Sequence, residues 1–98
     1  MVDQAIIDAM RKCRPLLEAE GVTGLFLYGS RARGDHRADS DVDVFIDHDE
    51  TARFSLFNLA GIKLAIEQQL GLEAHVTTRG SLFPAVRSEI EQNAIKVF

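Results

Sequence analysis

The sequence predicts a small α/β (α+β) domain, in which helices pack on one face of a small mixed sheet. Three observations predict it: an apolar stretch at residues 22–28 (VTGLFLY), an alternating stretch at residues 41–47 (DVDVFID), and segments of helical periodicity before and after them. The 98 residues have room for a single domain, residues 1–98, and for no second independent core. Helices on one face would leave the opposite face of the sheet open for chemistry.

The first half of the chain gives a helix, a strand, a loop and a second strand. Residues 3–20 form a helix that Pro15 is expected to break or kink, because proline lacks the amide hydrogen and clashes with the preceding turn. Gly21 ends this helix, and residues 22–28 follow as a buried strand. Residues 29–40 (GSRARGDHRADS) are typical of a turn and loop, and residues 41–47 have the two-residue period of a strand. The helix has apolar residues at helical spacing: Ile6, Met10, Cys13 and Leu17.

The second half predicts a long amphipathic helix at residues 52–70, which Gly71 ends. A short strand follows at residues 72–77, and Ser81 opens a last helix at residues 81–92. Residues 94–98 allow a closing strand. We expect Phe54, Phe57 and Phe83 to lie in the core.

Composition and charge restrict the class of protein. Apolar residues make up 46% and charged residues 27% of the chain, the balance of an ordinary soluble globular protein. The apolar runs are far too short to span a membrane, and Cys13 as the single cysteine fits a reducing compartment, so we expect a cytoplasmic protein without a membrane partner. The net charge of −4 argues against a broad nucleic-acid-binding surface.

The stretch G-S-R-A-R-G, residues 29–34, is the first motif with chemical meaning. Gly29 directly follows a strand, and a glycine there lets the backbone approach a bulky anion closely. The hydroxyl of Ser30 and the neighbouring amides can donate hydrogen bonds to a phosphate. A plain strand-to-helix turn is the alternative interpretation of this motif taken alone.

The second motif, S-D-V-D at residues 40–43, places two carboxylates on one strand face. The Cα atoms of Asp41 and Asp43 are expected roughly 6.5–7 Å apart, with their side chains on the face opposite the core. Such carboxylates repel each other unless a divalent cation lies between them, and magnesium is commonly held by one or two carboxylates plus phosphates. A solvated strand face is the alternative. We expect Asp47 and Asp49, which extend the acidic run, to be solvated, with an outer-shell role as the alternative for Asp47 because it shares the strand face of Asp43. The combined pattern G-S-x-x-x-G and D-x-D occurs by chance only roughly once per million starts.

These two motifs resemble the signature of the minimal nucleotidyltransferases, within the DNA polymerase beta superfamily, and the similarity extends over nearly the whole chain. The resemblance implies a nucleotidyltransferase-like fold. It implies that Gly29 and Ser30 bind the triphosphate of ATP or another nucleoside triphosphate, and that Asp41 and Asp43 hold two magnesium ions. Arg33 matches an arginine of the family's loop, for which we infer contact with phosphate or with a partner.

The function implied by the resemblance is transfer of a nucleoside monophosphate, AMP from ATP in the first instance, to an acceptor hydroxyl. The reaction would be an in-line attack on the α-phosphate with pyrophosphate leaving. Many members of this family are antitoxins encoded beside a HEPN-type toxin and modify a tyrosine on it. The resemblance thus points to a HEPN-type protein partner.

The sequence departs from the family pattern where a third carboxylate is expected, because that position holds His75. Histidine is a poor ligand for magnesium, which prefers oxygen. Glu73 lies two residues earlier on the same strand face and could substitute in part. His75 is a candidate general base or a plain strand histidine. The alternative function is therefore a weak or inactive homologue that neutralises its partner by binding.

Overall fold

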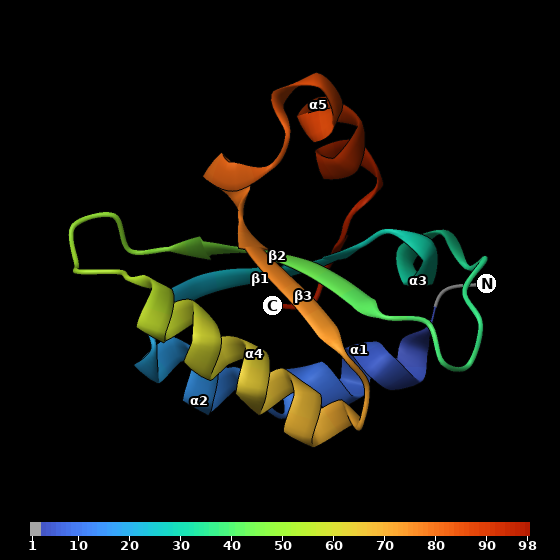
Figure 1. Cartoon of the computed structure of the whole chain (residues 1–98), viewed down its shortest axis with the longest axis horizontal. Coiled ribbons are helices and arrows are strands. Elements are labelled where there is room, and N and C mark those ends of the chain that lie inside the picture. Colours follow the sequence, from blue (N-terminus) through green and yellow to red (C-terminus); the bar gives the residue numbers. More distant parts are fainter. Residues whose placement is uncertain (1–2) are drawn as a thin grey trace.

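The computed structural model describes residues 3–98, which form a four-stranded sheet and five α-helices (Figure 1). Within residues 3–98, none of the helices combines the length and the apolar composition that a membrane span requires. In chain order the elements are α1 (Gln4–Arg11), α2 (Arg14–Ala19), β1 (Val22–Tyr28), α3 (Ser30–Arg33), β2 (Val42–His48), α4 (Leu56–Leu70), β3 (Ala74–Thr78), the 3-10 turn η1 (Arg79–Ser81), α5 (Pro84–Asn93) and β4 (Ile95–Lys96).

The sheet is mixed, with the strand order β3-β2-β1-β4. Strand β1 is antiparallel to both β2 and β4, whereas β2 and β3 are parallel. The register places Asp43 of β2 opposite Tyr28 on one side and opposite His75 on the other. The motif residues therefore meet at the end of β1, beside the beginnings of β2 and β3.

The hydrophobic core lies on one face of this sheet, which α1, α2 and α4 cover (Figure 1). Alternate residues of β1 and β2 point into it, as the two-residue period of a strand requires, and meet the apolar stripes of the three helices. Its fully buried aliphatic residues include Leu25, Leu27, Val42, Val44, Ile46, Ile62 and Ile66.

The other face of the sheet carries a different set of side chains, and one helix of the described residues, α5, stands over it. Helix α5 lies on this side, away from α1, α2 and α4, and none of its residues is buried (Figure 1). Phe26, Asp43 and Asp47 belong to this face because they alternate with the core residues of their strands. The mixed sheet with helices on one face is confirmed, with α5 as an addition on the opposite side. We call this second side the open face.

The observed boundaries agree with the predicted elements to within two residues, except at the starts of α4 and α5, and residues 30–33 of the predicted loop form the short helix α3. Strand β1 spans the predicted residues, and the first helix is broken before Pro15, at Lys12 and Cys13. Helix α4 begins four residues later than expected, because Ser55 and Asn58 form a capping box. Helix α5 begins at Pro84 rather than Ser81, since proline favours the first helical turn and residues 79–81 form the 3-10 turn.

Two of the three phenylalanines expected in the core are exposed, so that prediction is wrong for them. Phe57 is 89% exposed and Phe83 is 72% exposed. Phe57 lies in the first turn of α4 and Phe83 directly precedes α5, and neither that turn nor α5 contains a buried residue. Phe54 is half-buried and stacks on His48, with 4.3 Å between the ring centroids.

Candidate active site

The candidate site begins where the Gly29 bend approaches Asp43. Gly29 has φ +73°, a left-handed conformation that favours glycine, and it follows directly on β1. A Cβ atom at this position would lie 2.5 Å from Oδ2 of Asp43, closer than real Cβ contacts allow. Both the backbone conformation and the close approach therefore require glycine. The bend and the second aspartate are in contact, as a shared site requires.

Asp41, Asp43 and His75 form the acidic part of the site. Asp41 lies one residue before β2, and its Oδ2 is 2.9 Å from Nε2 of His75. Burial raises the pKa of Asp43; Asp41 adds to this rise, whereas His75 and Arg33 oppose it. The hydrogen bond with Asp41 raises the pKa of His75. Asp41 and Asp43 lie two residues apart on one strand face, and His75 pairs with Asp41, so a cation bound beside the two carboxylates would relieve their repulsion.

The donor atoms fit magnesium only when a substrate contributes the remaining ligands. Among residues 3–98, no three His, Cys, Asp or Glu side chains converge to hold a metal ion by themselves. Magnesium is commonly bound by one or two carboxylates together with phosphate oxygens and water, which Asp41 and Asp43 could provide in part. Glu73 is exposed and lies just before β3, where its backbone carbonyl accepts a hydrogen bond from Val42. Its side chain makes no hydrogen bond within the described chain.

Ser30 and Arg33 lie at the two ends of the short helix α3, directly after the bend. The backbone N–H groups of Ser30 and Arg31 donate to no protein acceptor among the described residues. Arg33 is half-exposed and pairs with Asp35 at 3.1 Å, a contact that a competing anion could replace. The two amide donors and the cationic side chain of Arg33 thus lie beside the paired aspartates. A polyphosphate with a bound metal ion requires donors and carboxylates side by side in this way.

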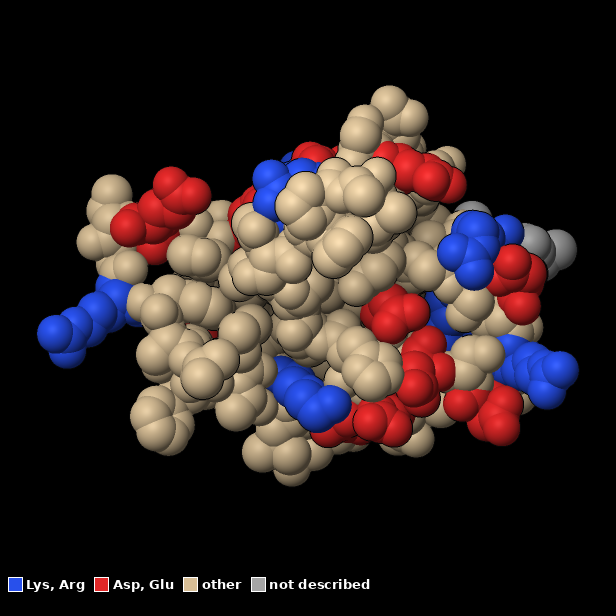
Figure 2. Space-filling view, turned by 45° about the horizontal axis from the view of Figure 1, so that its top comes forward, with Lys and Arg blue, Asp and Glu red and all other residues tan. Residues whose placement is uncertain are grey.

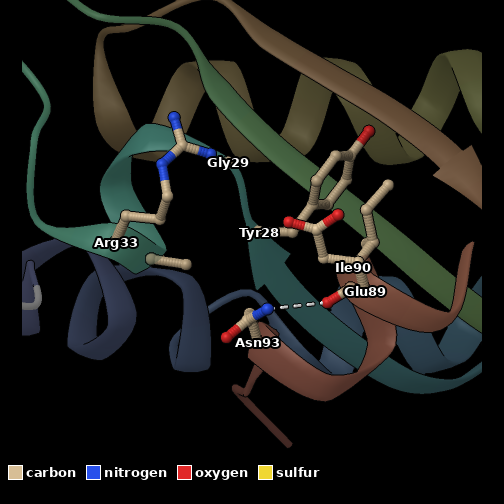
Figure 3. A pocket seen from close by; sticks show the side chains of 7 residues that line it. Tyr28, Gly29, Arg33, Glu89, Ile90 and Asn93 are labelled. Atoms are coloured by element: carbon tan, nitrogen blue, oxygen red, sulfur yellow. Dashed lines mark hydrogen bonds between the residues drawn. The ribbon is translucent and has the colours of Figure 1, made fainter. Parts of the chain in front are cut away.

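A cavity of about 460 Å³ opens between α3 and α5, next to this bend (Figure 3). In the close view, Arg33 lies on one side, and Glu89, Ile90 and Asn93 of α5 lie on the other. The residues that line it are Tyr28, Gly29, Ala32, Arg33, Glu89, Ile90 and Asn93. Its volume is in the range typical of small-molecule sites.

Arg31 supports the site from within the fold, a role that its place in the sequence does not reveal. It is 3% exposed and donates to the carbonyl oxygens of Arg37, Ala38 and Ser40 and to the carboxylate of Asp3. These bonds hold the segment that leads directly into Asp41. A planar guanidinium with several N–H donors can bond to these separate acceptors at once, which an ammonium group does less well. The only available signal was its place in the G-S-R-A-R-G motif, which does not distinguish it from Arg33.

Asp47 is not simply solvated, so that expectation is wrong. It accepts two hydrogen bonds from Arg79, at 2.7 and 2.9 Å, and this pairing lowers its pKa. The contact joins β2 to the 3-10 turn across the open face, which sequence spacing could not reveal. On this side of the molecule, acidic and basic side chains lie interspersed rather than in one broad patch (Figure 2).

This chain is similar to known proteins over nearly its whole length. The model of the family described as "Nucleotidyltransferase domain" matches residues 10–97. A protein of Methanocaldococcus jannaschii named "Putative protein adenylyltransferase" is 33% identical over 92 residues, which cover 94% of this chain and 97% of the relative. "Protein adenylyltransferase MntA" of Thermococcus cleftensis is 29% identical over 94 residues, with coverage of 96% and 91%.

Solved structures show the same fold. A structure described as a "putative minimal nucleotidyltransferase" has a TM-score of 0.79 and 30% identity, covering 97% of this chain and 95% of that one. A toxin–antitoxin complex with AMP-PNP has a TM-score of 0.69 at 11% identity, covering 90% of this chain and 72% of that one, and supports the fold alone. The family match and the near full-length similarity show that this chain belongs to the nucleotidyltransferase domain family, a family of enzymes.

Proposed function

We propose that this chain binds a magnesium–nucleoside triphosphate, ATP in the first instance, and transfers the nucleoside monophosphate to an acceptor hydroxyl. The observation that carries the proposal is the contact between the Gly29 bend and Asp43, where a Cβ would come within 2.5 Å of the carboxylate. It is supported by family membership, because nucleotidyl transfer requires a triphosphate and a divalent metal beside each other. The cavity beside the bend offers room for a ligand of this class.

Each residue of the site has a role in this proposal. Gly29 and Ser30 orient the triphosphate, and Asp41 and Asp43 supply the carboxylate ligands of two magnesium ions. When bound, magnesium would stabilise charge on the attacking and leaving oxygens. The acceptor oxygen forms a bond to the α-phosphorus, the bond to pyrophosphate breaks, and the acceptor proton passes to His75, the candidate general base of the site. Arg33 contributes positive charge, so positioning and electrostatics are the main contributions of the chain.

The acceptor is proposed to be a protein hydroxyl. The relatives from M. jannaschii and T. cleftensis are named as protein adenylyltransferases, which supports AMP as the transferred group and a protein as its acceptor. The motif resemblance points further, to a tyrosine of a HEPN-type toxin for which this chain is the antitoxin. Such an acceptor would reach the open face from solution, since Asp41 and His75 have half-exposed side chains there.

The direct test incubates the purified chain with a HEPN-type partner, magnesium and labelled ATP. We expect label on the partner, lost when its acceptor tyrosine becomes phenylalanine and lost with Asp43→Asn in this chain. Asp39→Asn is the matched control, because Asp39 is an exposed aspartate of the same region. Absence of label together with tight complex formation unaffected by Asp43→Asn would reject the enzymatic proposal.

A second candidate function is neutralisation of the partner by binding, with a catalytically weak site. The observation that favours it is His75, which stands where the family pattern has a carboxylate and pairs with Asp41 at 2.9 Å. If His75 weakens the site, His75→Asp raises magnesium affinity or transfer rate. If the same change abolishes transfer, His75 is a working residue and this second candidate loses its support.

A further inference from the structure

Arg79 joins two elements across the open face of the sheet. Its Nε and Nη2 donate to the two carboxylate oxygens of Asp47 on β2, at 2.7 and 2.9 Å, and its Nη1 donates to Oε2 of Glu91 on α5 at 2.6 Å. The guanidinium also lies over the rings of Phe26 and Phe45, 4.8 and 4.9 Å from their centroids. A bidentate, stacked and doubly paired arginine has a strongly fixed orientation.

Helix α5 has little else to hold it at the sheet. None of its residues is buried, and Phe83 and Val86 near its start are 72% and 41% exposed. Its other side-chain hydrogen bonds in the described chain stay within the helix or return to Gly80 in the 3-10 turn. Strand β4 fixes the end of α5 through its pairing with β1. Within residues 3–98, Arg79 links α5 to β2 by donating to Glu91 of α5 and to Asp47 of β2.

The opposite side of α5 forms one wall of the cavity beside the Gly29 bend (Figure 3). Glu89, Ile90 and Asn93 line this cavity, whereas Glu91 and Arg79 do not. Any shift of α5 away from the sheet would therefore widen the cavity without touching Asp41 or Asp43. The distance between the two walls depends on a contact that lies outside the cavity.

We propose that Arg79 is a positioning residue, which holds α5 through Glu91 and so sets the width of the nucleotide cavity. This inference rests on the proposed function for the identity of the ligand. Arg79 touches neither the triphosphate nor the metal in this account, and it acts on nucleotide affinity rather than on the chemical step. Loss of the link raises KM for magnesium–ATP and leaves kcat nearly unchanged, because the reacting groups keep their geometry.

The test uses Glu91→Ala, which removes the α5 half of the link while alanine keeps helical propensity. Gln92→Ala is the matched control, since Gln92 is the exposed neighbour on the same helix and makes no side-chain hydrogen bond in the described chain. Glu91→Gln is the conservative variant, because it retains an oxygen that can accept from Arg79. Three quantities are measured: the Kd of magnesium–ATP by calorimetry, kcat and KM, and hydrogen exchange of the amides at residues 84–93.

We expect Glu91→Ala to weaken magnesium–ATP binding about fivefold and to speed amide exchange in α5, with Glu91→Gln intermediate and Gln92→Ala unchanged. Equal ATP affinity in Glu91→Ala and wild type would overturn the inference while the proposed function stands. A fall in kcat with unchanged KM would overturn it as well. If the wild-type chain takes up no magnesium–ATP, the proposed function itself fails and this inference falls with it.

Discussion

The two faces of the four-stranded sheet are built from opposite kinds of side chain. The covered face presents Leu27, Val44 and Ile46 to α1, α2 and α4, and each of these is fully buried. The open face presents Asp43, Asp47 and partly exposed aromatic rings, with α5 standing over it at a distance from the core. The two sets alternate along the same strands, so the two-residue period of the strands determines the side chains of both faces.

The covered face mainly contributes to the stability of the fold, whereas the open face carries the candidate site. The covered face buries apolar area, which is the dominant favourable contribution to folding. The open face holds groups that cost stability on their own, above all a carboxylate whose pKa is raised by burial next to a glycine bend. Groups kept in an unfavourable state of this kind are characteristic of functional sites. Substitutions on the two faces should therefore separate into losses of stability and losses of activity.

The largest expected effect on stability is at Ile62, which packs on the covered face and is fully buried. Ile62→Ala should lower the free energy of unfolding by about 2–5 kcal/mol, because it removes buried methyl groups and leaves a cavity. Phe57→Ala is the contrast, since Phe57 is 89% exposed and its loss should change stability by less than about 0.5 kcal/mol. Urea unfolding of both variants measures this. Comparable losses would contradict the assignment of the core.

On the open face, Asp43→Asn should lower the transfer rate by on the order of a hundred- to a thousandfold, through loss of a metal ligand. The same change should raise the free energy of unfolding. Burial raises the pKa of Asp43, so folding favours the protonated form and the ionised carboxylate destabilises the fold near neutral pH. An assay of transfer from labelled ATP tests the predicted loss of rate, and urea unfolding without metal tests the predicted gain in stability. A variant that lost both activity and stability would place Asp43 among the structural residues.

Arg31 is buried and holds the loop that runs into Asp41. Arg31→Lys keeps the charge but cannot satisfy all of the carbonyl oxygens, so we expect a loss of about 1–3 kcal/mol. Arg37→Lys is the control, since the Arg37 side chain is exposed and makes no hydrogen bond in the described chain. Thermal or urea unfolding compares the two. Equal stabilities would show that the loop is held by other contacts.

The smallest expected effect concerns pH and the pair of Asp47 with Arg79. The hydrogen bonds from Arg79 lower the pKa of Asp47, so its contribution to stability is complete above the ordinary aspartate pKa of about 3.9. The contribution is lost as the pH falls through the lower pKa of the folded state. At neutral pH the free energies of unfolding of wild type and Asp47→Asn should differ by less than about 1 kcal/mol, since the pair is partly exposed. This difference should disappear at acidic pH. A difference in the free energy of unfolding that grew below pH 4 would contradict this prediction.

The covered face could be largely predicted from the sequence, because periodicity alone specifies which residues are buried. Strand β1 agreed with its predicted bounds, and the middle helix was wrong only at its start. That start is fixed by the capping pair Ser55 and Asn58, a signal that the sequence does contain. Phe57 and Phe83 were misplaced because an apolar side chain predicts burial only where a partner surface exists, and no local pattern records that surface.

The open face was predicted only where its residues belong to a continuous motif. The contact of Gly29 with Asp43 follows from two motifs separated by one loop. The contacts of Arg79 with Asp47 and Glu91 join residues that lie 32 and 12 positions apart in the sequence, and no spacing rule predicts such pairs. The buried role of Arg31 was likewise hidden, because its partners are mostly backbone carbonyls that any sequence provides.

The central claim is that the glycine–serine bend and the paired aspartates beside it together hold a triphosphate and its magnesium. Calorimetric titration of the purified chain with ATP, with and without magnesium, tests it most directly. The account predicts uptake of ATP that depends on magnesium and disappears in Asp43→Asn. Magnesium-independent uptake, or uptake that survives Asp43→Asn unchanged, would contradict it.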